Sequence, residues 1–208
     1  NHVIFRGIER RVIFQGPADY KEFLGRLALV KGDTHFIAWA LMPNHGHLLI
    51  RTGLQSLSRL MRRLLTGYAG YFNRRHRRSG HLFQNRYKSI VCDEDTYLKS
   101  LVRYIHLNPL KAGLVKDMKS LARYPWCGHG ALIGESKRDW QSIDDVLACF
   151  GKDRSSAIRR YLEYVEEGIK TKEKINFLGG GLIRSAGVVD AVLSRTREEY
   201  QASDARIL

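Results

Sequence analysis

Two strand-like segments joined by a short turn constrain the fold of this chain more than any other feature. Residues 36–41 (FIAWAL) are continuously apolar, and residues 45–50 (HGHLLI) follow after the turn residues 42–44 (MPN). Apolar runs of this length, bounded by turn residues, are typical of buried β-strands. The short connection favours antiparallel pairing of the two strands. The sequence therefore predicts a β-hairpin, with its first strand in the centre of a sheet.

The second strand of this hairpin carries two histidines, His45 and His47, separated by Gly46. Because side chains alternate between the faces of a strand, both imidazoles are expected on one face. Imidazole is the commonest protein ligand for a divalent metal, and two of them leave positions open for water or substrate oxygens. The pair could equally line a half-polar strand face, so a metal site also requires a third ligand and a reactive group.

Residues 95–108 are predicted to form a helix, and this helix carries a phenol, Tyr104, and a possible oxygen ligand, Asn108. Its apolar residues recur at helical spacing, and Pro109 disfavours helix beyond Asn108. Tyr104 and Asn108 are four residues apart, so they share one helix face. A nucleophile and a metal ligand could therefore approach one site together.

The charge of the chain indicates a polyanionic partner. Its 208 residues carry a net charge of +14 and give a pI near 9.9. Between Arg51 and Arg103 there are twelve Arg or Lys residues and three Asp or Glu residues. Such a stripe can be a solvated face, but beside a metal and a nucleophile it favours contact with a phosphate backbone.

The remaining patterns complete an α+β fold. Strands are predicted at residues 3–5 and 82–92, and helices at residues 19–30 and about 56–72. The order β-α-β-β-α-β is that of a ferredoxin-like antiparallel sheet with helices on one face. The open face would carry the histidines, with the helix of residues 95–108 packed near them.

The sequence changes character after about residue 130. Residues 142–147, 155–168 and 188–200 predict helices, and the glycines of residues 179–181 predict a hinge or turn. These glycines lack the Lys-Ser/Thr that a phosphate-binding P-loop needs. We therefore predict a first domain at residues 1–130 and a helical C-terminal extension at residues 131–208.

Several blocks of the sequence resemble the single-tyrosine HUH transposases of the IS200-like superfamily, and most closely the REP-associated tyrosine transposases. The resemblance covers residues 2–126 and is carried by blocks in a fixed order. They are residues 6–14 (RGIERRVIF), 41–49 (LMPNHGHLL), 71–76 (YFNRRH), 80–89 (GHLFQNRYKS) and 103–109 (RYIHLNP). The residue between the two histidines is usually bulky in that family, so Gly46 is expected to leave a packing gap on the opposite face of the strand.

The resemblance implies the same fold, a catalytic nucleophile at Tyr104 and a metal bound by His45, His47 and Asn108. The expected metal is Mg²⁺ or Mn²⁺, although two imidazoles would also tolerate Zn²⁺. The implied substrate is single-stranded DNA that forms a REP-like hairpin, cleaved through a covalent 5′-phosphotyrosine by a monomer or homodimer. The candidate DNA-binding side chains are Arg6, Arg10, Arg11, Arg62, Arg63, Gln84, Arg86 and Lys88.

Two other functions remain open from the sequence. A domesticated, non-cleaving DNA-binding protein would need the basic residues alone, and a metal-dependent nuclease using activated water would not need Tyr104. Tyr97 is a rival nucleophile, but it lacks a ligand four residues later. His106 lies on another helix face, where a structural role or a DNA contact is expected. Aromatic side chains available for base stacking, or for the core, are Tyr68, Tyr71, Phe72 and Tyr87.

The number of cysteines and the hydropathy of the sequence indicate in which cellular compartment the protein is expected. Cys92, Cys127 and Cys149 are odd in number and widely spaced, which argues against a disulfide framework and a zinc knuckle. No apolar run is long enough for a membrane span. We therefore expect a cytoplasmic, nucleoid-associated protein without a membrane partner.

Overall fold

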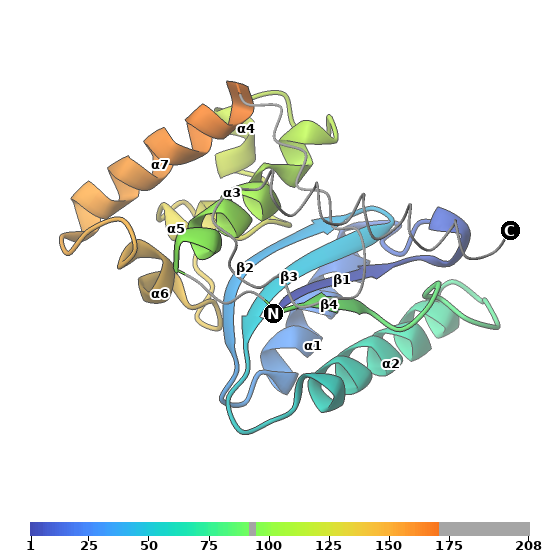
Figure 1. The fold of residues 1–208 in the computed structure, drawn as a ribbon. Helices are drawn as coiled ribbons and strands as arrows, with labels where there is room; N and C mark the ends of the chain where they lie inside the picture. The colour runs from blue at the N-terminus through green and yellow to red at the C-terminus, as the bar shows by residue number, and fades with distance from the viewer. Residues whose placement is uncertain (92–94, 171–208) are drawn as a thin grey trace, which may run out of the picture.

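The computed structural model describes residues 1–91 and 95–170, which form one sheet between two layers of helices (Figure 1). The strands are β1 (His2–Arg6), β2 (His35–Met42), β3 (His45–Arg51) and β4 (Lys88–Ile90). The helices are α1 (Pro17–Val30), α2 (Leu57–Arg75), α3 (Asp95–Lys111), α4 (Met118–Ala122), α5 (His129–Leu132), α6 (Ile143–Leu147) and α7 (Arg154–Lys170), with a short 3-10 helix at Ile8–Arg10. The predicted glycine hinge at 179–181 and helix at 188–200 lie outside the described residues.

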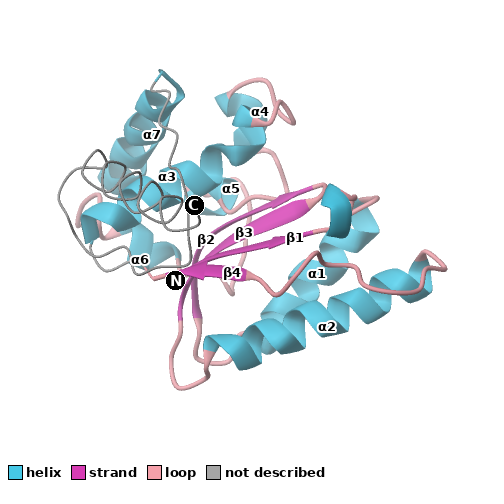
Figure 2. Cartoon of the chain, turned by 45° about the vertical axis from the view of Figure 1, so that its right-hand side comes forward, coloured by secondary structure: helices cyan, strands magenta, loops and turns pink. Residues whose placement is uncertain are grey.

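The four strands are antiparallel and lie in the order β2-β3-β1-β4, which confirms the predicted ferredoxin-like sheet. Helices α1 and α2 cover one face of it (Figure 2). Their apolar stripes pack on the side chains of the strands that point to this face, among them Phe5, Leu48 and Ile50. This core fixes the position of every second residue of β1 and β3.

The opposite face is covered by α3 and by the C-terminal helices. Ala38, Ala40 and Leu49 project from the sheet into a second core that α3 and α7 share. The hydroxyl of Tyr161 on α7 lies 2.7 Å from Nδ1 of His106 and 2.7 Å from Nδ1 of His129, and all three side chains are fully buried. The helix that carries Tyr104 is thus held between the sheet and α7.

Strand β2 was predicted to be central, and this prediction is wrong because β2 is an edge strand. It is nevertheless buried, since residues 126–142 pair with its outer edge. The amide of Leu41 donates to the carbonyl of Trp126, and that of Gly128 donates to the carbonyl of Trp39. The Trp39 indole Nε1 donates to Oε1 of Gln141 at 2.8 Å. Burial of both faces and of the outer edge explains the continuous apolar run.

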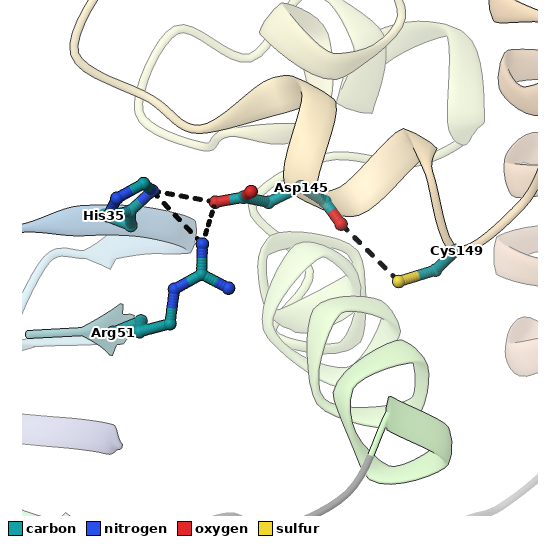
Figure 3. Close-up of polar contacts among 4 residues, drawn as sticks. All are labelled: His35, Arg51, Asp145 and Cys149. Carbon is teal, nitrogen blue, oxygen red and sulfur yellow. Dashed lines mark hydrogen bonds and ion pairs between the residues drawn. The ribbon is translucent and has the colours of Figure 1, made fainter. Parts of the chain in front are cut away.

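An ionic cluster joins Asp145 of α6 to the first residue of β2, His35, and the last residue of β3, Arg51 (Figure 3). Asp145 Oδ2 accepts from Arg51 Nη2 at 2.8 Å and lies 2.9 Å from Nδ1 of His35. The thiol of Cys149 contacts the Asp145 carbonyl at 3.5 Å, and Cys127 and Cys149 are free thiols. Residues 131–170 therefore share a core and an ionic contact with the sheet, and the domain boundary at residue 130 stays a prediction.

Two predicted boundaries differ from the structure. The strand predicted at residues 82–92 is regular only in β4, because residues 82–87 follow β1 irregularly, with one isolated bridge between Gly7 and Phe83. Helix α3 continues through Pro109 to Lys111, so the predicted end at Asn108 is wrong. None of the helices in the described residues is long and apolar enough to cross a membrane.

Candidate functional site

The structure brings the two histidines and the tyrosine together on one face of the sheet. The rings of His45 and His47 lie on β3 with their centroids 5.2 Å apart. Tyr104 on α3 presents its ring edge-on to His47, at a centroid separation of 5.7 Å. His47 is 4% exposed, whereas His45 and Tyr104 are half-buried. A substrate phosphate could therefore reach the tyrosine and the outer histidine from solvent.

Hydrogen bonds at Nδ1 orient both imidazoles. Nδ1 of His45 lies 2.6 Å from Oδ1 of Asn44, whose Nδ2 donates to the Arg10 carbonyl. Because an amide oxygen can only accept, His45 must donate from Nδ1, which leaves the lone pair on its Nε2. Nδ1 of His47 lies 3.1 Å from Nε2 of His2. Both rings thus direct Nε2 away from their supporting partners, as metal-binding imidazoles do.

Asn108 lies one helical turn after Tyr104, as the spacing predicted. Its Nδ2 donates to the Tyr104 carbonyl at 2.9 Å, and the Asn108 side chain acts to lower the pKa of the Tyr104 phenol. Asn108 is half-buried, and its Oδ1 is the atom suited to a hard divalent cation. The residues that could hold a metal are therefore two imidazoles and one amide oxygen, next to a phenol.

Burial controls the protonation of this site. Desolvation, with a smaller contribution from the nearby Arg6 guanidinium, lowers the pKa of His45 to about 4. Desolvation also lowers the pKa of His47 well below its ordinary value, and His2, His45 and Arg6 act in the same direction. Desolvation also raises the pKa of Tyr104, which the hydrogen bond to Asn108 and the charge of Arg6 partly oppose. Near neutral pH the histidines are uncharged and ready to bind a cation, whereas the phenol keeps its proton.

Within the described residues, no group of three His, Cys, Asp or Glu side chains could hold a metal ion. A metal at this site would therefore depend on Asn108 and on oxygens from substrate or water to complete its coordination. The donor set fits Mg²⁺ or Mn²⁺, because such sites keep several positions for phosphate and water oxygens.

The packing gap expected behind Gly46 does not exist. A Cβ on Gly46 would lie 2.2 Å from Cζ of Phe5, whose ring occupies this space on the face opposite the histidines. Phe5 stacks on Phe23 with centroids 5.0 Å apart and is 2% exposed. The glycine is therefore matched by a large aromatic neighbour in β1.

Some predicted DNA-binding residues lie beside the histidines. Arg6 is exposed and pairs in register with His45, and Lys88 of β4 shares that face of the sheet through its register with Ile4. Gln84 and Arg86 are exposed on the irregular segment before β4, where the Gln84 amide donates to the Arg6 carbonyl at 2.9 Å. These side chains form a basic border along the β4 side of the site.

Arg10 and Arg11 follow β1 in the chain, and Arg10 lies next to the turn that carries Asn44. Arg10 has a φ of 60°, and its carbonyl accepts the hydrogen bond from Asn44 that also orients His45. Arg11 is exposed and forms an ion pair with Glu9 at 2.8 Å. The segment therefore contributes to the site through the Arg10 carbonyl, and DNA contacts by these two arginines stay a prediction.

The structure separates Arg62 and Arg63 from the histidines. Both are exposed on α2, which covers the other face of the sheet. With Arg26 of α1 they line a groove of about 530 Å³ between the two helices. A DNA contact by these two arginines stays a prediction, and it would lie away from the histidine face.

Other sequence-based expectations are settled by burial. Tyr68 and Phe72 are fully buried in the first core, so their use for base stacking is wrong, while Tyr71 and Tyr87 are partly buried. His106 is fully buried, so its role is structural and a DNA contact is wrong. Tyr97, the rival nucleophile, packs against the second core.

Sequence reasoning missed His2 and Asn44, which support the two imidazoles from behind. Asn44 directly precedes His45, and its place in the turn was the only local signal. His2 lies in β1, and its proximity to His47 depends on the pairing of Ile4 with His47 across the two strands. Taken together, the histidine pair on β3 of the antiparallel sheet faces Tyr104 on helix α3.

The family model described as "Transposase IS200 like" matches residues 1–108, which is more than half of the chain. The chain belongs to this family of DNA-processing enzymes, as the sequence resemblance indicated. It is also similar to the structure of a REP-associated tyrosine transposase bound to a REP hairpin, with 19% identity and a TM-score of 0.52. That similarity covers 88% of this chain and 92% of the other, and it shows a shared fold. A search of the curated proteins found no match.

Proposed function

We propose that this protein cleaves and rejoins single-stranded DNA that folds into a hairpin, through a covalent bond to Tyr104. The main support is the position of Tyr104, whose ring lies 5.7 Å from that of His47 and whose backbone carbonyl accepts from Asn108 Nδ2 one helical turn later. Membership of a transposase family supports the reaction class, and the hairpin in the similar structure supports the kind of substrate.

His45, His47 and Asn108 would hold a Mg²⁺ or Mn²⁺ ion. Bound there, the ion would neutralise the scissile phosphate and stabilise the charge that develops on its oxygens. The tautomer of His45 suits this role, because its Nδ1–H is engaged by Asn44 and its Nε2 is available. The low pKa of both imidazoles also suits it, since a protonated histidine cannot bind a metal.

Tyr104 would attack phosphorus in line with the departing 3′ oxygen. A bond forms between the phenol oxygen and phosphorus as the bond from phosphorus to the 3′ oxygen breaks. The phenol gives up its proton to solvent and the departing 3′ oxygen takes one up, so the products are a 5′-phosphotyrosine and a free 3′ hydroxyl. Ionising a phenol of ordinary pKa at pH 7 costs roughly 4 kcal/mol. Burial raises this cost, and Arg6 and Asn108 lower it. A new 3′ hydroxyl can reverse the step, so strands can be exchanged without ATP.

The basic border would hold the DNA backbone. Arg6, Gln84, Arg86 and Lys88 are exposed along the β4 side of the site. Contacts of this kind are independent of sequence and weaken as salt rises.

The test is a denaturing gel of protein incubated with labelled hairpin DNA and Mn²⁺. We expect a covalent adduct with the wild-type protein, none after Tyr104→Phe, and none when the metal is chelated, with hairpin binding retained in both cases. Tyr97→Phe is the matched control and should still form the adduct. Cleavage without an adduct would indicate activated water, binding without cleavage would indicate a non-cleaving DNA-binding protein, and an adduct in Tyr104→Phe would exclude Tyr104 as the nucleophile.

A further inference from the structure

The ring of His2 lies next to the candidate metal site, beside both its inner histidine, His47, and its tyrosine, Tyr104. The side chain is fully buried, and its ring lies edge to edge with that of His47, at a centroid separation of 5.3 Å and an interplanar angle of 16°. The same ring is edge-on to Tyr104 at 6.1 Å. His2 therefore contacts a candidate ligand and the candidate nucleophile without occupying the position of either.

The hydrogen bond between His2 and His47 can form with either ring as the donor, and each possibility requires a different tautomer of His47. Nε2 of His2 and Nδ1 of His47 are 3.1 Å apart, so one proton lies between them. If His47 holds that proton, the lone pair of its ring is on Nε2 and is available to a metal. If His2 holds it, neutral His47 must carry its own proton on Nε2, which blocks that atom as a ligand.

The hydrogen bond between His2 and His47 is shielded from solvent. His2 is 0% exposed and His47 is 4% exposed, so bulk water does not reach the bond between them. The outer ligand offers a comparison, because the amide oxygen of Asn44 fixes His45 in the tautomer with the lone pair on Nε2. An acceptor at Nε2 of His2 would give His47 the same tautomer as His45.

We propose that His2 is a positioning residue that accepts the Nδ1 proton of His47 and so holds His47 in the metal-binding tautomer. This proposal rests on the proposed function, because it assigns His47 as a metal ligand. Outer partners of this kind contribute to metal affinity, and their removal typically weakens it about 10- to 100-fold.

The first measurement needs no metal. In protein labelled with ¹⁵N-histidine, the imidazole shifts should show His47 with its proton on Nδ1. His2→Leu, which fills the space without an acceptor, should redistribute the His47 proton between the two nitrogens. A wild-type His47 protonated at Nε2, or an unchanged His47 in His2→Leu, would refute the proposal even if the metal site itself is real.

The second measurement is Mn²⁺ affinity by calorimetry on DNA-free protein. His2→Leu should bind Mn²⁺ about 10- to 100-fold more weakly than the wild type, and His2→Gln, whose amide oxygen can accept, should recover most of that loss. His35→Gln is the control, because His35 lies at the end of β2 that is farther from His45, and this variant should bind Mn²⁺ normally. Equal weakening by His2→Gln and His2→Leu would reduce His2 to a packing role. If His45→Ala leaves Mn²⁺ binding unchanged, the proposed metal site fails, and the tautomer measurement still decides the role of His2.

Discussion

Replacing Gly46 with alanine tests the packing behind the histidine pair. The added Cβ would lie 2.2 Å from Cζ, 2.7 Å from Cε1 and 3.0 Å from Cε2 of Phe5. The ring cannot move freely, because it stacks on Phe23 at 5.0 Å and meets Phe83 edge-on at 5.9 Å. Alanine must therefore displace a packed ring or separate β1 from β3.

The expected magnitude follows from two opposed effects. Overpacking a well-filled core costs about 1–3 kcal/mol, whereas replacing a strand glycine with alanine gains about 0.5–1 kcal/mol. We expect Gly46→Ala to lower the free energy of unfolding by about 1–2 kcal/mol on this balance. Urea unfolding at constant pH measures this difference.

A double-mutant cycle makes the test specific to Phe5. Phe5→Leu removes the ring atoms that meet the new Cβ, so Gly46→Ala combined with Phe5→Leu should be more stable than the sum of the single changes by about 1 kcal/mol or more. Gly70→Ala is the control, because nothing lies within 4 Å of a Cβ at this exposed α2 position. That change should stabilise the protein by up to about 1 kcal/mol. A neutral Gly46→Ala, or strict additivity with Phe5→Leu, would refute the steric reasoning.

Three further predictions concern pH, DNA binding and the second core. Burial lowers the pKa of five histidines, so stability should be greatest above their ordinary value of 6.5 and fall by at least about 2 kcal/mol from pH 7 to pH 5, because the unfolded chain takes up protons first; a flat urea midpoint over this range would contradict it. Arg6→Ala should weaken hairpin binding and slow cleavage of bound DNA, whereas Arg63→Ala should weaken binding alone and reduce the salt slope by about 1; unchanged affinity in Arg63→Ala would remove α2 from the DNA-binding surface. Tyr161→Phe leaves two buried Nδ1 atoms without the hydroxyl they share, so it should cost about 1–3 kcal/mol in urea unfolding; a cost near zero would show that the hydroxyl contributes little.

Local periodicity was enough to predict which residues share a face. Alternation put His45 and His47 on one side of β3, and helical spacing put Tyr104 and Asn108 on one side of α3. The meeting of the two pairs depends on α3 packing against the sheet, for which only the family resemblance gave an indication. His2 escaped prediction because its role depends on the register of β1 against β3, which no short stretch of sequence specifies.

Apolar composition predicted burial correctly but not position in the sheet. β2 is as apolar as a central strand because residues 126–142 close its outer edge. Residues 126–142 follow the last block that carries the family resemblance. The apolar run at 36–41 therefore gave no indication that they would cover the outer edge of β2. In the same way Pro109 predicted the end of α3, yet the helix continues for a further turn, with the Ala112 amide donating to the Asn108 carbonyl at 2.9 Å.

The basic residues that are close together in the sequence lie on two different surfaces of the folded protein. Arg62 and Arg63 lie on α2, on the far face of the sheet from the histidines, while Arg86 and Lys88 lie on the β4 side of the site. Because the β2 edge is closed by residues 126–142, DNA that contacts both surfaces cannot pass around that edge of the sheet. Arginines on α2 would then bind only DNA that extends beyond the cleavage site. Shortening the duplex stem of the hairpin should therefore remove the effect of Arg63→Ala on affinity while preserving that of Arg6→Ala.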